Sequence, residues 1–204
     1  MSEVMLVQHG DGRLNDQITA GMYRLRHTVF HDRLGWDVGS DNGMEYDEFD
    51  KIKPVYILVR GDNNEIEGCW RMLPTMGPNM LRDVFPQLLY GQPMPQQPDV
   101  WEVSRFAVAA DNAEGGGFGF SEVPMRIMQM SVRFAQQNGI KRYVAVISAA
   151  LERLSRKAGV NISRFGPPIK IGKVLTVACI IEIDSITEFA LFGTLPEDAS
   201  RKVA

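Results

Sequence analysis

Cysteine, histidine and recognisable metal motifs are scarce in this sequence, which narrows the chemistry it can perform. The 204 residues include two cysteines, Cys69 and Cys179, and each lies in an apolar, strand-like run where a small buried thiol is the ordinary outcome. There is no CxxC pair and no His/Cys cluster, and His9, His27 and His31 do not show the paired spacing of a zinc site. We therefore expect no bound metal.

Basic charge and long apolar runs are also lacking. The formal net charge is -3 and the isoelectric point is near 5.7, whereas a nucleic-acid-binding domain has an isoelectric point above roughly 9. No window approaches the roughly 18 apolar residues of a membrane span, and the N-terminal MSEVMLVQHGDG lacks a basic region followed by a long apolar stretch. These absences predict a cytoplasmic protein that binds neither nucleic acid nor membrane.

The remaining composition is typical of one α/β domain. Hydrophobic residues make up 45% and charged residues 23% of the chain, which fits a single domain over residues 1–204. Strand-like and helical patterns interleave without an internal repeat, so we expect one mixed, mostly antiparallel sheet flanked by helices. The expected strands cover residues 4–8, 55–60, 65–73, 101–109, 142–148 and 174–183, and the expected helices cover 14–29, 80–90, 121–139 and 151–158.

Two connecting segments carry information. The residues Gly61-Asp62-Asn63-Asn64 tolerate positive φ and therefore predict an antiparallel hairpin between the strands at 55–60 and 65–73. Residues 31–54 hold many charges, several glycines and little periodicity, and irregular chain of that length is usually functional or mobile. We expect this segment to cover a substrate.

A set of charged and aromatic residues recurs in short strings along the chain. The strings are LRHTVF, GWD, EYDEFD, GCWRML and WEVSRFAV, and their informative residues are Arg26, Phe30, Trp36, Asp47, Asp50, Arg71, Glu102 and Arg105. Together they resemble the acyl-homoserine lactone synthase (autoinducer synthase) family, in which the same residue types follow in the same order. The resemblance continues through TMGPNMLRDVFPQLL and NISRFGPPIKIG, so it covers most of the chain.

The resemblance implies a fold and a reaction. The fold would be N-acyltransferase-like, with a V-shaped cleft where the strand beginning at Trp101 and the strand beginning at Tyr143 splay apart. The reaction would transfer a medium-length fatty-acyl chain from acyl carrier protein to the amine of S-adenosylmethionine, and then close the lactone with release of methylthioadenosine. S-adenosylmethionine is then a substrate, and no cofactor is expected.

The ligand's chemistry suggests which residues touch it. A sulfonium cation is stabilised by aromatic faces, for which Phe30 and Trp36 are candidates, although both also suit a core. The resemblance assigns Asp47 to the ligand's amine and places Arg105 and Phe106 beside it. The residues Arg26, Asp50, Arg71, Glu102 and Arg105 are expected to form a charge network that organises the irregular segment over the sheet.

The strand around Glu102 is expected to carry the acylation chemistry. Side chains alternate along a strand, so Glu102 and Arg105 point to opposite faces unless a bulge brings them together. Amide formation needs an acceptor for the proton of the amine, and Glu102 is the candidate general base. The alternative is a structural Glu102 paired with an arginine. A backbone N–H at Phe106 or its neighbours is expected to bind the oxyanion.

The acyl chain needs an apolar tunnel, and its donor needs a docking surface. We expect the tunnel to hold about eight unsubstituted carbons. Its predicted lining is Met80, Leu81, Phe85, Met125, Met128, Val146, Ser148, Ala149, Leu151 and Leu175. An acidic carrier protein would dock on the densest basic cluster, Lys141, Arg142, Arg153, Arg156 and Lys157, although these side chains also suit a solvated helix face, and acyl-coenzyme A serves as donor in some family members.

Two other functions remain open at this point. An N-acetyltransferase that uses acetyl-coenzyme A would share the fold, and the glycine-rich run Gly115–Gly119 suggests its pyrophosphate loop, but the usual spacing of that loop is missing. A non-catalytic protein that senses S-adenosylmethionine or a lactone would keep the pocket without turnover. Release of methylthioadenosine distinguishes the synthase from both.

Overall fold

The computed structural model describes residues 2–110 and 120–193, so the Gly115–Gly119 run lies outside the described residues. The main sheet has eight strands in the order β1-β4-β5-β6-β7-β10-β8, with β9 paired to β10 beyond this path. Its strands are β1 (Glu3–Gln8), β4 (Val55–Arg60), β5 (Ile66–Pro74), β6 (Val100–Val108), β7 (Arg142–Ser148), β8 (Ile162–Arg164), β9 (Ile169–Ile171) and β10 (Val174–Glu182).

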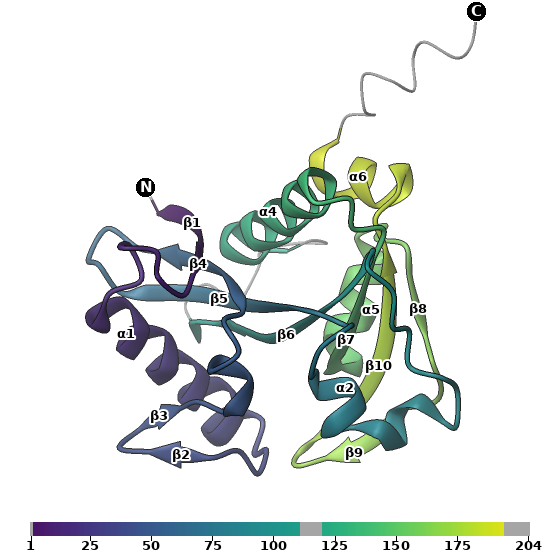
Figure 1. Ribbon diagram of the computed structural model, residues 1–204, viewed down its shortest axis with the longest axis horizontal. Coiled ribbons are helices and arrows are strands. Elements are labelled where there is room, and N and C mark those ends of the chain that lie inside the picture. Colours follow the sequence, from purple (N-terminus) through teal and green to yellow (C-terminus); the bar gives the residue numbers. More distant parts are fainter. Residues whose placement is uncertain (1, 111–119, 194–204) are drawn as a thin grey trace, which may run out of the picture.

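Helices cover both faces of this sheet (Figure 1). They are α1 (Asp16–Arg26), the π-helix η1 (His27–Arg33), α2 (Met80–Asp83), α4 (Glu122–Gln137), α5 (Ala149–Lys157), α6 (Ser185–Phe192) and the short 3-10 helices η2 (Glu48–Asp50) and η3 (Pro86–Leu89). A separate two-stranded sheet is formed by β2 (Ser40–Asp41) and β3 (Met44–Glu45). Within the described part of the chain, no helix combines the length and apolarity needed to cross a membrane.

The sheet is antiparallel apart from one central pair, as the sequence predicted. The hairpin of β4 and β5 pairs Val55 with Met72 at one end, and Asn64 in its turn has a φ of 65°. Helix α4 packs closely on β5 at Gly68, where a Cβ would lie 2.7 Å from side-chain atoms of Val123 and Ile127. A glycine is therefore needed at this helix–sheet contact.

The central strands β6 and β7 are parallel and separate along their length. Their pairing begins at Val100 with Arg142 and ends at Val103 with Ala145, although both strands continue for several residues. Since each strand's later residues have no partner across this pair, the sheet opens into a V at its centre. The expected splayed, mostly antiparallel fold is confirmed.

A bulge in β6 lies next to this opening. Pairing with β5 steps from Cys69 opposite Ala107 to Arg71 opposite Ser104, so β6 has one residue more than β5 across this stretch. Arg105 within it has a φ of 58°, a left-handed conformation that is uncommon for a residue with a side chain. This is the kind of bulge that is needed to turn Arg105 toward the side of the strand on which Glu102 lies.

Three helical and irregular segments differ from the expected pattern. The helix expected at 14–29 becomes a π-helix after Arg26 and runs on to Arg33. The segment 31–54 is not wholly irregular, because it contains β2, β3 and η2. The helix expected at 80–90 is two short helices, and Pro86 begins the second, since proline lacks the N–H needed to continue the first.

Candidate active site

A cavity of about 760 Å³ opens where β6 and β7 separate. One end is formed by η1, the loop after it and β6, and the other by the end of β7 with α5 and the start of α4. Its lining is Val29, Phe30, Arg33, Leu34, Trp36, Met80, Phe85, Glu102, Ser104, Arg105, Phe106, Val108, Phe120, Ser121, Pro124, Val146, Ile147, Ser148, Ala150, Leu151 and Leu154. The volume lies within the range of about 300–1,000 Å³ typical of small-molecule sites.

Three buried arginines form the charge network beside this cavity. Arg26 contacts Glu45 through Nε at 2.6 Å and Asp50 through Nη1 at 2.8 Å. Arg71 donates from Nη1 to Asp47 at 2.5 Å and to Asp50 at 2.8 Å. Asp50 is thus shared by two guanidiniums.

The third arginine, Arg105, connects the network to the cavity. Its Nη2 lies 2.9 Å from Glu45 Oε1 and 2.9 Å from Asp47 Oδ2. Both Arg105 and Arg71 also donate to the sulfur of Met80, at 3.3 and 3.0 Å. Arg105 and Met80 line the cavity, so the network supports the cavity wall from behind.

Local structure holds the acidic residues in place. Asp47 is the N-cap of η2 and accepts from the N–H of Phe49, while Asp50 accepts from the N–H of Asp47, which makes a reciprocal capping pair. Tyr56 on β4 donates to Asp50 at 2.6 Å. Although burial opposes ionisation, Arg26 and Arg71 hold the pKa of Asp50 well below its usual range. The carboxylate therefore stays charged.

Asp47 lies in the charge network behind the cavity wall. Asp47 was expected at the amine of the ligand, but it does not line the cavity. Both of its oxygens accept hydrogen bonds from Arg71, and one of them also lies against Arg105. Arg26, Asp50 and Arg71 likewise lie behind the cavity wall. None of these four residues is among those that line the cavity, and their contacts with Arg105 and Met80 support its wall.

The predicted aromatic pair does line the cavity. Phe30 and Trp36 are 3% and 7% exposed, and their ring centroids are 5.4 Å apart. Phe85 extends the cluster, with its centroid 5.9 Å from that of Trp36. The guanidinium of Arg105 lies 5.1 Å from the centroid of Phe30. Among the described residues, the buried indole N–H of Trp36 has no hydrogen-bond partner. The pair therefore has both a packing role and a polar donor.

Glu102 is fully buried and lines the cavity together with Met80. Its carboxylate accepts from the backbone N–H groups of Met80 at 2.9 Å and Leu81 at 2.7 Å, at the start of α2. The alternative was a Glu102 paired with an arginine, but among the described residues no arginine donates to its carboxylate. Burial raises the pKa of Glu102 above its usual value, and the two N–H groups oppose this.

Five of the ten residues predicted for the acyl pocket line the cavity. They are Met80, Phe85, Val146, Ser148 and Leu151. The other five are not among the lining residues. Leu81 and Ala149 are buried in the core, Met125 and Met128 belong to the core on the α4 face, and Leu175 is 51% exposed on β10.

The five basic residues predicted as a docking surface are all exposed. Arg142 contacts Glu182 at 3.1 Å, and Arg156 contacts the buried carboxylate of Glu152 at 2.5 Å. Lys141 precedes β7, and Arg153 and Lys157 lie on α5. Other residues of the same helix, Ala150, Leu151 and Leu154, line the cavity, so part of the basic cluster lies close to the acyl end.

Sequence reasoning missed four residues of the site. Glu45 is fully buried and bridges Arg26 and Arg105. Its only sequence signal was its position at the start of the string EYDEFD. Tyr56 and Ser104 complete the hydrogen bonding of Asp50 and Arg71. Arg33 lines the cavity, and its guanidinium donates to the carbonyl of Val108 at 3.3 Å. No periodic pattern marks any of these residues.

The fold is shared with acyltransferases of low sequence identity. A putative N-acetyltransferase from Lactobacillus plantarum matches with a TM-score of 0.58 and 14% identity over 90% of this chain and 99% of that one. The CoA-dependent acyl-homoserine lactone synthase BjaI, solved with SAM and isopentyl-CoA, matches with a TM-score of 0.78 and 24% identity over 92% of this chain and 88% of that one. The architecture is that of an N-acyltransferase.

Higher-identity comparisons define the family. The Autoinducer synthase family matches residues 12–191. An acyl-homoserine-lactone synthase from Pseudomonas aeruginosa is 41% identical over 192 residues, 93% of this chain and 94% of the relative. The crystal structure of the AHL synthase LasI has a TM-score of 0.86 and 37% identity, covering 96% of this chain and 97% of that one. TofI, solved with an inhibitor and MTA, has a TM-score of 0.76 and 37% identity, covering 92% and 96%.

The chain therefore belongs to the autoinducer synthase family. It is an enzyme, an acyltransferase with acyl-homoserine-lactone synthase activity, as the residues of the network and the cavity had suggested.

Proposed function

We propose that this enzyme takes its acyl chain from acyl carrier protein, joins it to the amine of S-adenosylmethionine and closes the product into a lactone. The proposal rests on one observation: the residues that line the cavity differ in character between its two ends. One end is aromatic and charged, with Phe30, Trp36 and Arg33, and the other is apolar, with Val146 and Leu151. Glu102 lies between the two ends, where the two substrates would meet.

The first end suits S-adenosylmethionine. The faces of Phe30 and Trp36 stabilise a sulfonium cation, which is worth about 0.5–2 kcal/mol according to the degree of desolvation. The unpaired indole N–H of Trp36 gains an acceptor when a polar ligand enters, which removes the cost of a buried donor. Arg33 is placed to bind the ligand's carboxylate, because its present partner is a neutral backbone carbonyl.

Acylation takes place between the two ends. The amine of S-adenosylmethionine loses a proton to Glu102, directly or through one water, and its lone pair attacks the thioester carbonyl. The raised pKa of Glu102 makes its carboxylate a stronger base than an ordinary glutamate. A backbone N–H around Phe106, where β6 bulges and leaves β7, binds the oxyanion. The nitrogen of the tetrahedral intermediate then gives up a second proton as the C–S bond to the carrier breaks, so that the amide forms and the carrier leaves as its thiol.

Lactone closure follows in the same cavity. A carboxylate oxygen of the acylated ligand attacks the carbon bonded to the sulfonium, the C–S bond breaks, and its electron pair neutralises the sulfur as methylthioadenosine leaves. No proton has to move in this step. The enzyme's contribution is to hold the methionine-derived part folded between the aromatic rings and Arg33, which brings the two reacting atoms together.

Carrier protein is the donor that the surface of α5 supports. Its exposed residues Arg153, Arg156 and Lys157 are basic in a chain whose net charge is -3. Its residues Ala150, Leu151 and Leu154 line the acyl end, so an acidic partner held on α5 would have a short path for its thioester into the cavity. The two remaining basic residues, Lys141 and Arg142, precede and begin β7, and they extend this basic surface.

The decisive experiment is mass spectrometry of the products formed from S-adenosylmethionine with either acyl carrier protein or coenzyme A loaded with chains of about four to twelve carbons. We expect acyl-homoserine lactone and methylthioadenosine, fastest from carrier protein and from a chain of about eight unsubstituted carbons. Faster turnover with acyl-coenzyme A than with acyl carrier protein would refute carrier protein as the donor. An acyl product without lactone indicates the N-acetyltransferase alternative, and no turnover indicates the sensor.

A charge-reversal pair tests the docking surface. Arg153→Glu is expected to raise the KM for acyl carrier protein several-fold and to weaken its dependence on salt, because a steering charge is lost. Arg24→Glu, an equal change at an exposed position of α1, is the matched control. Equal KM values for the two variants would remove α5 from the docking role.

A further inference from the structure

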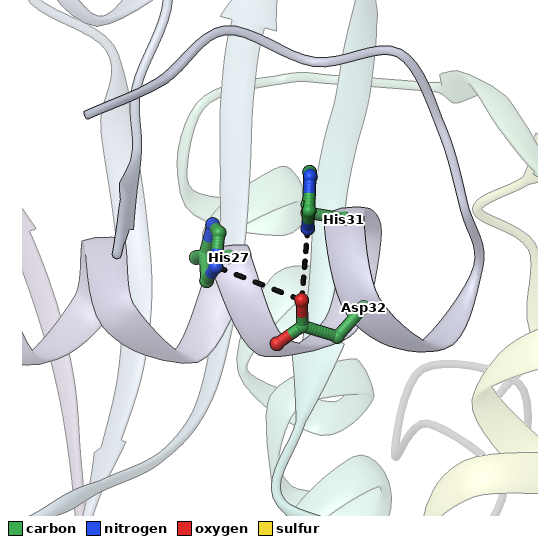
Figure 2. Close-up of side chains that lie close together, drawn as sticks. All are labelled: His27, His31 and Asp32. Atoms are coloured by element: carbon green, nitrogen blue, oxygen red, sulfur yellow. Dashed lines mark hydrogen bonds and ion pairs between the residues drawn. The ribbon is translucent and has the colours of Figure 1, made fainter. Parts of the chain in front are cut away.

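The π-helix η1 carries a second polar cluster beside the residues that line the cavity. Figure 2 shows His27, His31 and Asp32 with both rings directed toward the same Asp32 oxygen. That oxygen, Oδ1, is 2.8 Å from His31 Nδ1 and 3.6 Å from His27 Nε2. The two imidazoles are stacked, with centroids 4.7 Å apart and an angle of 13° between their planes.

A serine from the neighbouring small sheet orients one of the rings. Ser40 Oγ on β2 lies 2.6 Å from His27 Nδ1. When Nδ1–H donates to the serine oxygen, the proton is fixed on Nδ1 and Nε2 keeps its lone pair. Nε2 is the atom that faces Asp32. Metal-binding histidines are commonly oriented in this way by a partner on the second ring nitrogen.

We propose that His27, His31 and Asp32 bind one divalent transition-metal ion, with Zn²⁺ as the reference case. Two imidazoles and a carboxylate are a common zinc ligand set, and histidines four residues apart on one side of a helix are a recurrent metal-binding arrangement. In a tetrahedral zinc site the ligand atoms are about 3.4 Å apart, and the two distances to Asp32 lie on either side of this value.

This proposal departs from the expectation of no metal. That expectation treated the three histidines as lacking paired spacing, and it overlooked that His27 and His31 are four residues apart. The three ligand atoms lie within 4.8 Å of one another, which is close to the spacing that one bound ion requires. None of the three residues lines the cavity. Because His31 and Asp32 are exposed, a water molecule can occupy the fourth ligand position of the ion.

Metal binding would also act on the cavity wall. The same helix carries Phe30 and Arg33, and Ser40 belongs to the segment that leads into the charge network. A metal joining residues 27, 31 and 32 holds successive positions of η1 together. It therefore favours the arrangement of η1 in which Phe30 and Arg33 face the cavity.

The test is calorimetric titration of the tag-free full chain with ZnCl₂, followed by the visible spectrum of the Co²⁺ complex. We expect one ion per chain and tetrahedral Co²⁺ bands. His27→Gln and His31→Gln should each weaken binding at least about tenfold, and Ser40→Ala should weaken it about tenfold through ring orientation. His9→Gln, the only other histidine, is the matched control and should bind normally.

Two results would overturn the proposal: no saturable binding below about 100 µM, or binding that survives both His27→Gln and His31→Gln. Both histidines are at least partly exposed, so these variants are expected to fold. Because the titration uses no substrate, its outcome is independent of the acyl donor and of the catalytic roles proposed above.

Discussion

Replacing Glu45 by glutamine is the sharpest test of the charge network. The side chain is fully buried and contacts Arg26 Nε at 2.6 Å, Arg105 Nε at 3.0 Å and Arg105 Nη2 at 2.9 Å. Glutamine keeps the size but removes the charge and turns an N–H donor toward a guanidinium. Breaking a buried ion pair costs about 3–5 kcal/mol. Arg26 keeps Asp50 and Arg105 keeps Asp47, so we expect the lower end of this range.

A loss of about 3 kcal/mol corresponds to a roughly 150-fold larger unfolded fraction. Urea unfolding followed by tryptophan fluorescence measures it as a lower midpoint at an unchanged slope. Glu48→Gln is the control, because Glu48 is an exposed glutamate in the same short segment and should change the free energy of unfolding by at most about 0.5 kcal/mol. If Glu45→Gln also stays within that limit, the network does not stabilise the fold as we argue.

Three further changes probe the site. Glu102→Gln should slow single-turnover acylation about 10²- to 10⁴-fold while S-adenosylmethionine still binds; an unchanged rate removes Glu102 from the base role. Trp36→Phe should weaken S-adenosylmethionine binding several-fold in calorimetry, because the indole donor is lost; equal affinity would contradict this contact. The pKa of Asp50 is lower in the folded protein than in the unfolded chain. Its carboxylate therefore stabilises the fold above about pH 4, and this stabilisation is lost as the pH falls through the pKa that Asp50 has in the folded protein. The unfolding free energy of Asp50→Asn should therefore fall less steeply with acid, and parallel curves would refute this.

Much of the fold is predictable because its signals are local. The β4–β5 hairpin is marked by two β-rich apolar runs on either side of a turn that tolerates positive φ, and α4 by an apolar stripe that ends at Gly139. The splayed strands follow from the family resemblance and not from periodicity. The change from α1 to a π-helix has no such signal, since both kinds of helix place apolar residues at similar spacing.

The site is less predictable because its contacts depend on tertiary register. Glu102 was assigned to the right cavity, but its bonds to Met80 and Leu81 arise only because the start of α2 reaches β6. The role of Glu45 depends on β3 lying against α1, far along the chain from Arg105. Leu175 was predicted to line the acyl tunnel because it is an apolar residue on a long strand, but its side chain is exposed.

The bulge in β6 connects the stability of the fold to the position of the chemistry. In a regular strand Glu102 and Arg105 would face opposite sides, whereas the extra residue lets Glu102, Ser104 and Arg105 all line the cavity. The positive φ of Arg105 costs of order 1–3 kcal/mol and persists only where the surroundings enforce it. Its ion pairs with Glu45 and Asp47 provide that constraint. The network therefore acts on the reaction indirectly: it maintains the strained backbone that opens the cavity beside Glu102.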